Sequence, residues 1–186
     1  MMDAQWAQAL LYGNLVSHAV LFVGVVWCIA FPARRIYPMN EPNAWYYAMW
    51  LLFGFIFLSN PVFVYLDWNS GPWTDALRFW LAITLILLGG GLVSWGMAVL
   101  GSKRTSGLPE GLVVEGPYLF TRNPQYVGDA LLFVGVAVFS NSEVVLVTHL
   151  LTALVLLAAP IAEETWLDDQ YGDPYVDYRH RTPRYL

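Results

Sequence analysis

The residues best suited to chemistry lie in one short stretch, Gly116 to Gly128, which reads G-P-Y-L-F-T-R-N-P-Q-Y-V-G. Between two long apolar segments it carries a cation, Arg122, an amide, Asn123, and two tyrosines. A guanidinium is costly in hydrocarbon unless it has a partner or reaches water, so this stretch is not an ordinary membrane-spanning segment. Its two prolines prevent a helix from running through and bias the preceding residues toward extended backbone. We therefore predict a bent polar loop at the edge of a bilayer.

A second polar block, Glu163 to Tyr185, follows one apolar hairpin later. It begins with the adjacent carboxylates Glu163 and Glu164 and ends in tyrosines and arginines, which suit hydrogen bonding and charge pairing. A further carboxylate, Asp129, lies inside the apolar segment after the first block, and it is either a site residue or a structural partner of Arg122. We interpret the two blocks as the halves of one site.

The composition indicates a polytopic membrane protein. Of the 186 residues 58% are hydrophobic and only 12% are charged, whereas soluble domains are nearer half apolar and a quarter charged. The net charge of -5 comes with no basic stripe, which argues against a nucleic-acid partner. Cys28 is the single cysteine, so a disulfide or a thiolate metal site is excluded and no metal is predicted.

The apolar segments predict an all-α protein with five transmembrane helices. They run over Ala7–Phe31, Trp45–Leu66, Ala76–Leu100, Gln125–Phe139 and Val144–Ala162. The fourth segment is short for a hydrocarbon core of about 30 Å, so its start is predicted to lie below the membrane surface, against a cavity. After the fifth we expect a short amphipathic helix around Trp166, ended by Gly172, and then a tail. Residues 1–186 are predicted to form one membrane domain, with three helices in 1–100.

The cations predict the orientation. With five spans, all the arginines and lysines except Arg78 fall at one end of the bundle. The positive-inside rule then places the N-terminus outside, and the tail and both polar blocks in the cytoplasm.

The two polar blocks together carry an ordered motif set. The first reads G-P-Y-x3-R-N-P-x-Y-x-G, and the second reads E-E-x2-L-x3-Y-G-x2-Y-x2-Y-x4-P-R. The set resembles the integral membrane methyltransferases, a superfamily that includes the isoprenylcysteine carboxyl methyltransferases and the phospholipid N-methyltransferases. The resemblance covers Gly107 to Leu186, nearly half of the chain.

The resemblance implies a pocket for S-adenosylmethionine between the membrane core and the cytoplasmic tail, without a Rossmann domain. Tyrosine rings can stack on adenine or meet a sulfonium, and a glutamate can accept hydrogen bonds from ribose hydroxyls or an ammonium. Arg122 could pair with the cofactor's carboxylate. Carried over by position, the cofactor-binding residues are Glu110, Gly111, Leu112, Val113, Tyr118, Asn123, Pro124, Gln125, Tyr126 and Glu163.

Two departures from the family bear on the substrate. Asn123 stands where the carboxyl methyltransferases carry histidine, and an amide does not titrate near neutrality, so no acid–base role is expected there. The prenylcysteine enzymes also place a substrate-binding arginine in the segment that corresponds to Leu156–Ala162, which is uncharged here. This argues against a carboxylate substrate. The catalytic candidates are then Arg122, Glu164 and Asp129, with His180 as a further possible base.

The sequence thus predicts an S-adenosylmethionine-dependent enzyme that methylates a lipophilic, membrane-resident substrate. An alternative is an NADPH-dependent reductase of the sterol-reductase type, whose pattern includes a Tyr-x-Gly-Asp matching Tyr126 to Asp129. The loop before Arg122 offers only Lys103 and Arg104 for the NADPH phosphate, which counts against it. A third alternative is a non-enzymatic scaffold or transporter, although a transporter would carry its charges near the midplane. The methyl acceptor and the oligomeric state stay open.

Overall fold

The computed structural model describes residues 4–186, and within that range every regular element is a helix. The long apolar helices are α1 (Gln5–Ala30), α2 (Ala44–Leu66), α3 (Leu77–Leu100), α5 (Pro124–Ser140) and α6 (Glu143–Tyr171). The shorter elements are α4 (Ser102–Thr105), α7 (Asp173–Arg181) and the 3-10 turns η1 (Pro32–Arg34) and η2 (Gly116–Leu119).

The helix lengths confirm a polytopic membrane protein of the all-α class. Helices α1, α2, α3 and α6 are long and apolar enough to cross a membrane, and α5 is apolar but has only 17 residues. The predicted starts and ends of the first four apolar segments agree with α1, α2, α3 and α5 to within two residues. The short fourth segment is therefore a short helix, as the sequence predicts.

The fifth predicted segment ends too early. Helix α6 does not stop at Ala162 but continues to Tyr171. Its 29 residues, at about 1.5 Å per residue, give a total length of about 43 Å. The amphipathic stretch around Trp166 is thus the last part of α6 and not a separate helix. Pro160 lies inside the helix without ending it, and the chain turns only at Gly172, whose φ of 60° suits glycine. The separate short helix, α7, begins after this glycine.

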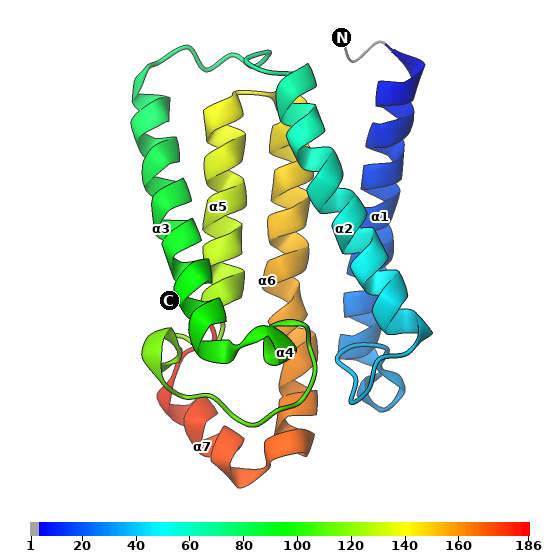
Figure 1. The fold of residues 1–186 in the computed structure, drawn as a ribbon, viewed down its shortest axis with the longest axis vertical. Helices are drawn as coiled ribbons and strands as arrows, with labels where there is room; N and C mark the ends of the chain where they lie inside the picture. The colour runs from blue at the N-terminus through cyan, green and yellow to red at the C-terminus, as the bar shows by residue number, and fades with distance from the viewer. Residues whose placement is uncertain (1–3) are drawn as a thin grey trace.

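The helices alternate in direction, so their connections gather at two ends (Figure 1). The described N-terminal part of the chain, the α2–α3 connection and the α5–α6 turn lie at one end. The other end carries η1, α4, the loop after it, η2, α7 and the C-terminal tail. Both polar blocks predicted from the sequence therefore lie at the same end, which we call the loop end.

Helices α3 and α5 pack with their backbones in close contact. A Cβ atom added at Gly89 would lie 2.5 Å from the carbonyl oxygen of Gly128, and one added at Gly128 would lie 2.8 Å from the carbonyl oxygen of Gly89. Small residues permit this approach in membrane helices, where tight packing stabilises helix pairs. The contact fixes the first turn of α5, which carries Gln125 and Tyr126, against the lower part of α3.

Buried polar side chains tie the first two helices to α6. The Asn14 side chain in α1 donates a hydrogen bond to Ser59 Oγ in α2 at 2.7 Å. One turn further, His18 Nε2 lies 2.8 Å from Thr152 Oγ1 in α6. In an apolar setting such hydrogen bonds add direction to helix packing that otherwise rests on van der Waals contact. They hold α1 and α2 beside the helices that carry the polar blocks.

Candidate functional site

The first polar block forms a 3-10 turn followed directly by a helix. Pro117 lies at the start of η2 and Pro124 at the start of α5, where the missing backbone N–H is not needed. Between them Thr121 is buried, and its hydroxyl accepts a hydrogen bond from the backbone N–H of Asn123 at 3.2 Å. The prolines thus place the polar residues on a rigid bend at the mouth of the bundle.

The two polar blocks meet around one cavity of about 140 Å³ at the loop end. Its walls come from the η1–α2 loop, α4 and the loop after it, η2, α5, α6 and α7. Ten of the predicted site residues line it: Gly111, Leu112, Val113, Tyr118, Arg122, Asn123, Gln125, Tyr126, Glu163 and Glu164. We call this space the polar cavity.

Glu163 is held by two tyrosines that come from distant parts of the chain. Its Oε1 accepts short hydrogen bonds from the hydroxyls of Tyr37 and Tyr126, and these two hydroxyls lie 3.0 Å apart. Burial raises the pKa of Tyr37 well above its usual value, and the neighbouring Glu163 carboxylate adds to the effect. Tyr37 therefore stays a hydrogen-bond donor at neutral pH. Among the described residues none donates to Oε2 of Glu163, so this oxygen can accept from a ligand.

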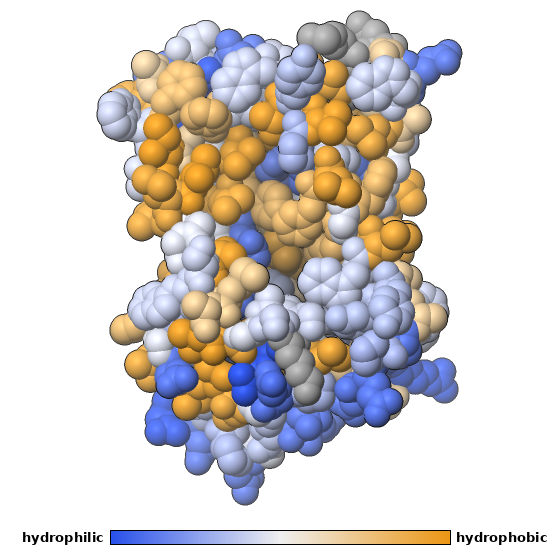
Figure 2. Space-filling model, viewed as in Figure 1, coloured by the Kyte–Doolittle hydropathy of each residue, from blue (hydrophilic) through white to orange (hydrophobic). Residues whose placement is uncertain are grey.

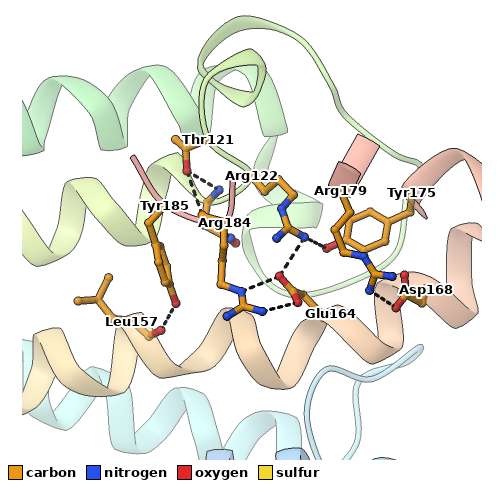
Figure 3. A network of polar contacts seen from close by, with 10 residues as sticks. Thr121, Arg122, Leu157, Glu164, Asp168, Tyr175, Arg179, Arg184 and Tyr185 are labelled. Atoms are coloured by element: carbon orange, nitrogen blue, oxygen red, sulfur yellow. Dashed lines mark hydrogen bonds and ion pairs between the residues drawn. The ribbon is translucent and has the colours of Figure 1, made fainter. Parts of the chain in front are cut away.

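Glu164 is the centre of a charge network (Figure 3). Arg184 donates to both of its carboxylate oxygens at 2.7 Å, and Arg122 Nη1 lies 2.9 Å from Oε1. Arg122 also donates to the hydroxyl of Tyr175 at 3.3 Å, while its buried Nε has no partner among the described residues. Because two guanidiniums meet one carboxylate, the network keeps one positive charge beside the polar cavity.

The C-terminal tail is bound along the first polar block. The backbone carbonyl of Arg184 accepts hydrogen bonds from the side chains of Thr121 and Asn123, both at 3.0 Å. The Arg122 backbone N–H donates to the Pro183 carbonyl at 2.9 Å. The side-chain nitrogen of Asn123 thus binds the tail, although the residue also lines the polar cavity. The tail is part of the wall of the site.

A tyrosine cluster forms another wall. Tyr118, Tyr175 and Tyr178 are buried together, and the Tyr178 hydroxyl donates to the Tyr118 carbonyl at 2.6 Å. Burial raises the pKa of Tyr175 to about 12, and it also raises the pKa values of the other two. All three rings are therefore neutral at physiological pH and present aromatic surface to the cavity.

Two of the predicted cofactor residues do not line this cavity. Glu110 is exposed, and its carboxylate lies 3.7 Å from Arg104, which also binds the carbonyls of Glu110 and Gly111 at 3.1 and 3.0 Å. Arg104 thereby folds the loop after α4 over the cavity. Pro124 is buried at the start of α5, where it shapes the backbone.

Asp129 lies away from the polar cavity, in the lining of a second one. This second cavity measures about 460 Å³ and is enclosed mainly by apolar side chains of α1, α2, α3, α5 and α6. We call it the apolar cavity. Asp129 does not pair with Arg122, whose partners are Glu164 and Tyr175. The sequence left two interpretations of Asp129 open, a site residue or a structural partner of Arg122. The second interpretation is therefore wrong.

The two cavities share one wall. Tyr37, Thr105, Gln125 and Tyr126 line both of them. Sequence reasoning misses Tyr37 altogether, because it lies 126 residues before Glu163 and belongs to neither polar block. Tyr175 and Tyr178 belong to the second motif, so their spacing in the sequence was a usable signal.

The comparisons with known proteins identify the family. A family model described as phospholipid methyltransferase matches residues 77–174, which is more than half of the chain. The matched segment runs from the start of α3 into the first turn of α7 and contains both glutamates, but not Tyr37 or Arg184. Comparison with curated proteins and with solved structures gave no match. Nothing in these findings supports the reductase or scaffold alternatives, and the chain belongs to the phospholipid methyltransferase family.

Proposed function

We propose that this protein transfers a methyl group from S-adenosylmethionine to a lipophilic acceptor that reaches the site from the membrane. The observation that carries the proposal is the meeting of the two motif blocks around the polar cavity, next to an apolar cavity that shares a wall with it. A polar cofactor and a lipophilic acceptor need two such environments within reach of each other.

The unpaired atoms of the polar cavity fit the charges of the cofactor. Oε2 of Glu163 is available to the ribose hydroxyls or the ammonium, and the surplus positive charge at Arg122 is available to the carboxylate. The neutral rings of Tyr118 and Tyr175 offer flat surfaces for the adenine or the sulfonium. When bound, S-adenosylmethionine would supply an electrophilic methyl group, which the acceptor nucleophile takes as the sulfur–methyl bond breaks.

The chain's own part in the reaction is then mainly alignment and exclusion of water. Tyr37 and Tyr126 fix the Glu163 carboxylate from two sides, and the tail fixes the loop that carries Arg122. Such positioning supplies a large share of the rate in a reaction between two bound partners. Because both oxygens of Glu164 are bound by arginines, we assign Glu164 and Arg122 positioning and charge-balancing roles and not proton transfer.

We also propose that the loop end faces the cytoplasm. Every arginine and lysine of the chain except Arg78 belongs to the elements of that end, and Arg78 lies in the first turn of α3 at the opposite end (Figure 1). Positive residues near the ends of membrane helices favour the cytoplasmic side. The cofactor would then be taken from the cytoplasm, and the N-terminus would be outside.

Calorimetry on purified protein in lipid nanodiscs tests the cofactor assignment. We expect S-adenosylhomocysteine, the product form, to bind saturably at the polar cavity, and NADPH not to bind. Arg122→Gln should weaken the binding about tenfold because it removes the charge partner of the cofactor's carboxylate. Arg181→Gln, an exposed arginine of α7 that does not line the cavity, is the matched control and should not. Binding of NADPH with no binding of S-adenosylhomocysteine would reject the proposal in favour of the reductase.

A further inference from the structure

The apolar cavity has a single charged side chain in its described lining. Its described lining is apolar or neutral with one exception, Asp129, and it includes no arginine or lysine. Figure 2 shows a hollow with apolar side chains behind it at mid-height on the face that α2 and α3 border in Figure 1. A lipid could therefore enter this cavity from the side, but its head group would meet a carboxylate and not a cation.

Asp129 has no partner within the described part of the chain. No side chain described in residues 4–186 forms a hydrogen bond or ion pair with it, although it lies one helical turn after Gln125 on the inner side of α5. Asp129 is half-buried in the wall of an apolar cavity, where a carboxylate without a partner is costly, and a ligand that donates a hydrogen bond or carries a positive charge would remove that cost. A ligand with a second negative charge would increase it.

The arginines that line the polar cavity do not line the apolar one. They are Arg104 and Arg122. Arg104 donates to three backbone carbonyls, those of Leu100, Glu110 and Gly111. Arg122 is paired with Glu164. A phosphate or carboxylate inside the apolar cavity would thus have no described cation within its walls.

We propose that the apolar cavity is the acceptor site and that Asp129 makes it selective by charge. The occupant is a long-chain lipophile whose head is a neutral or cationic hydrogen-bond donor, and a head that carries a phosphate or carboxylate is excluded. Asp129 is the specificity-determining residue. The assignment of the cavity to the acceptor rests on the proposed function. A phospholipid would consequently have to keep its phosphate outside this cavity.

Photo-crosslinking tests the selectivity without relying on turnover. Protein in nanodiscs is mixed with twelve-carbon chains that carry a diazirine at mid-chain and end in an amine, a hydroxyl, a carboxylate or a phosphate monoester. After illumination, mass spectrometry measures labelling of cavity-lining residues, such as the half-buried Phe53 in α2 and the buried Leu156 in α6, relative to the exposed Leu58. The amine and hydroxyl chains should label the cavity saturably, and the two anionic chains at least about tenfold less.

Variants separate the role of Asp129 from that of the cavity itself. Asp129→Asn keeps the shape and should reduce the preference for the amine over the anionic chains to about twofold or less. Glu143→Gln, an exposed acid at the opposite end, should leave all four profiles unchanged. Gly24→Phe fills the cavity from α1 and should abolish saturable labelling by every chain, which shows that the label comes from within it.

The outcomes distinguish this inference from the proposed function. Equal labelling by the phosphate and amine chains in the wild type, or an unchanged preference in Asp129→Asn, would overturn the charge selectivity even if S-adenosylhomocysteine binds. Absence of S-adenosylhomocysteine binding would overturn the proposed function, while the head-group series would still report on the cavity. Selective labelling together with cofactor binding supports both.

Discussion

The two ends of the bundle both carry clusters of polar side chains, but they use them differently. At the end opposite the loop end, Arg78 donates to the Trp73 carbonyl and to Asn69 Oδ1, both at 2.7 Å. Asn141 donates to Asn69 Oδ1 at 3.0 Å and to the Gly71 carbonyl at 2.9 Å. These hydrogen bonds lock the α2–α3 connection onto the α5–α6 turn, and half of them go to backbone carbonyls.

The loop end instead leaves polar atoms open beside a cavity. In the described part of the chain, each end has an arginine whose buried Nε lacks a partner, Arg78 and Arg122, but of the two only Arg122 lines either described cavity. Glu163 likewise has one oxygen bound by tyrosines and one oxygen without a described donor. A polar cluster in a membrane protein therefore indicates a site only where unpaired atoms and a cavity occur together. The cluster around Arg78 and Asn141, which borders no described cavity, stabilises the fold.

Glu163→Ala should have the largest effect and should separate the two ends most clearly. Of the two glutamates in the described lining of the polar cavity, it removes the one with an oxygen that lacks a described donor, so the affinity for S-adenosylhomocysteine should fall about 100-fold, or about 2.7 kcal/mol. Asp67→Ala is the matched control, because Asp67 binds Ser70 and Ser142 at the opposite end. Isothermal calorimetry measures both. Equal affinity in wild type and Glu163→Ala would contradict the view that the loop end binds the cofactor while the opposite end serves only stability.

Arg78→Ala should act on stability and not on binding. It removes the donor of the Trp73 carbonyl and one of the two donors of Asn69 Oδ1, so the free energy of unfolding should fall by about 2 kcal/mol. In the fraction that remains folded, the dissociation constant of S-adenosylhomocysteine should change less than about twofold. Chemical denaturation followed by circular dichroism gives the first quantity and calorimetry the second. A loss of affinity at unchanged stability would mean that the two ends are coupled.

Tyr37→Phe should have the smallest effect, because it removes one of the two donors to Glu163. The affinity for S-adenosylhomocysteine should fall about three- to tenfold, the range for one ordinary hydrogen bond, because Tyr126 still donates to Glu163. The pKa of Tyr37 is raised well above its usual value, so its hydroxyl is protonated throughout pH 6 to 9 and the loss should be constant over that range. Tyr47→Phe, an exposed tyrosine of α2, is the control. A loss that grows with pH would show that Tyr37 ionises.

Much of the fold could be predicted from the sequence because the decisive signals are local. A single apolar segment in hydrocarbon can satisfy its backbone hydrogen bonds only as a helix. For this reason the starts and ends of α1, α2, α3 and α5 were predicted to within two residues. The end of the fifth segment was predicted wrongly at Ala162, because α6 continues to Tyr171 and is ended by Gly172.

The candidate site was predictable only in part. The motif blocks give most of the residues around the polar cavity, because each block is contiguous and its spacing is visible. The partners of those residues were not predictable. Nothing in the spacing of Tyr37 and Glu163, or of Glu164 and Arg184, indicates that the side chains meet.

The sequence by itself determined which segments are membrane helices, where the polar blocks interrupt them, and to which family the motifs are similar. Only the tertiary structure decided that Tyr37 joins Glu163, that the tail closes the wall through Arg184, and that Asp129 lies in a different cavity from Arg122. The physical reason is that hydropathy and helix-breaking residues act within a few turns of chain. The meeting of side chains depends on the tilt and rotation of whole helices, which packing between distant segments fixes.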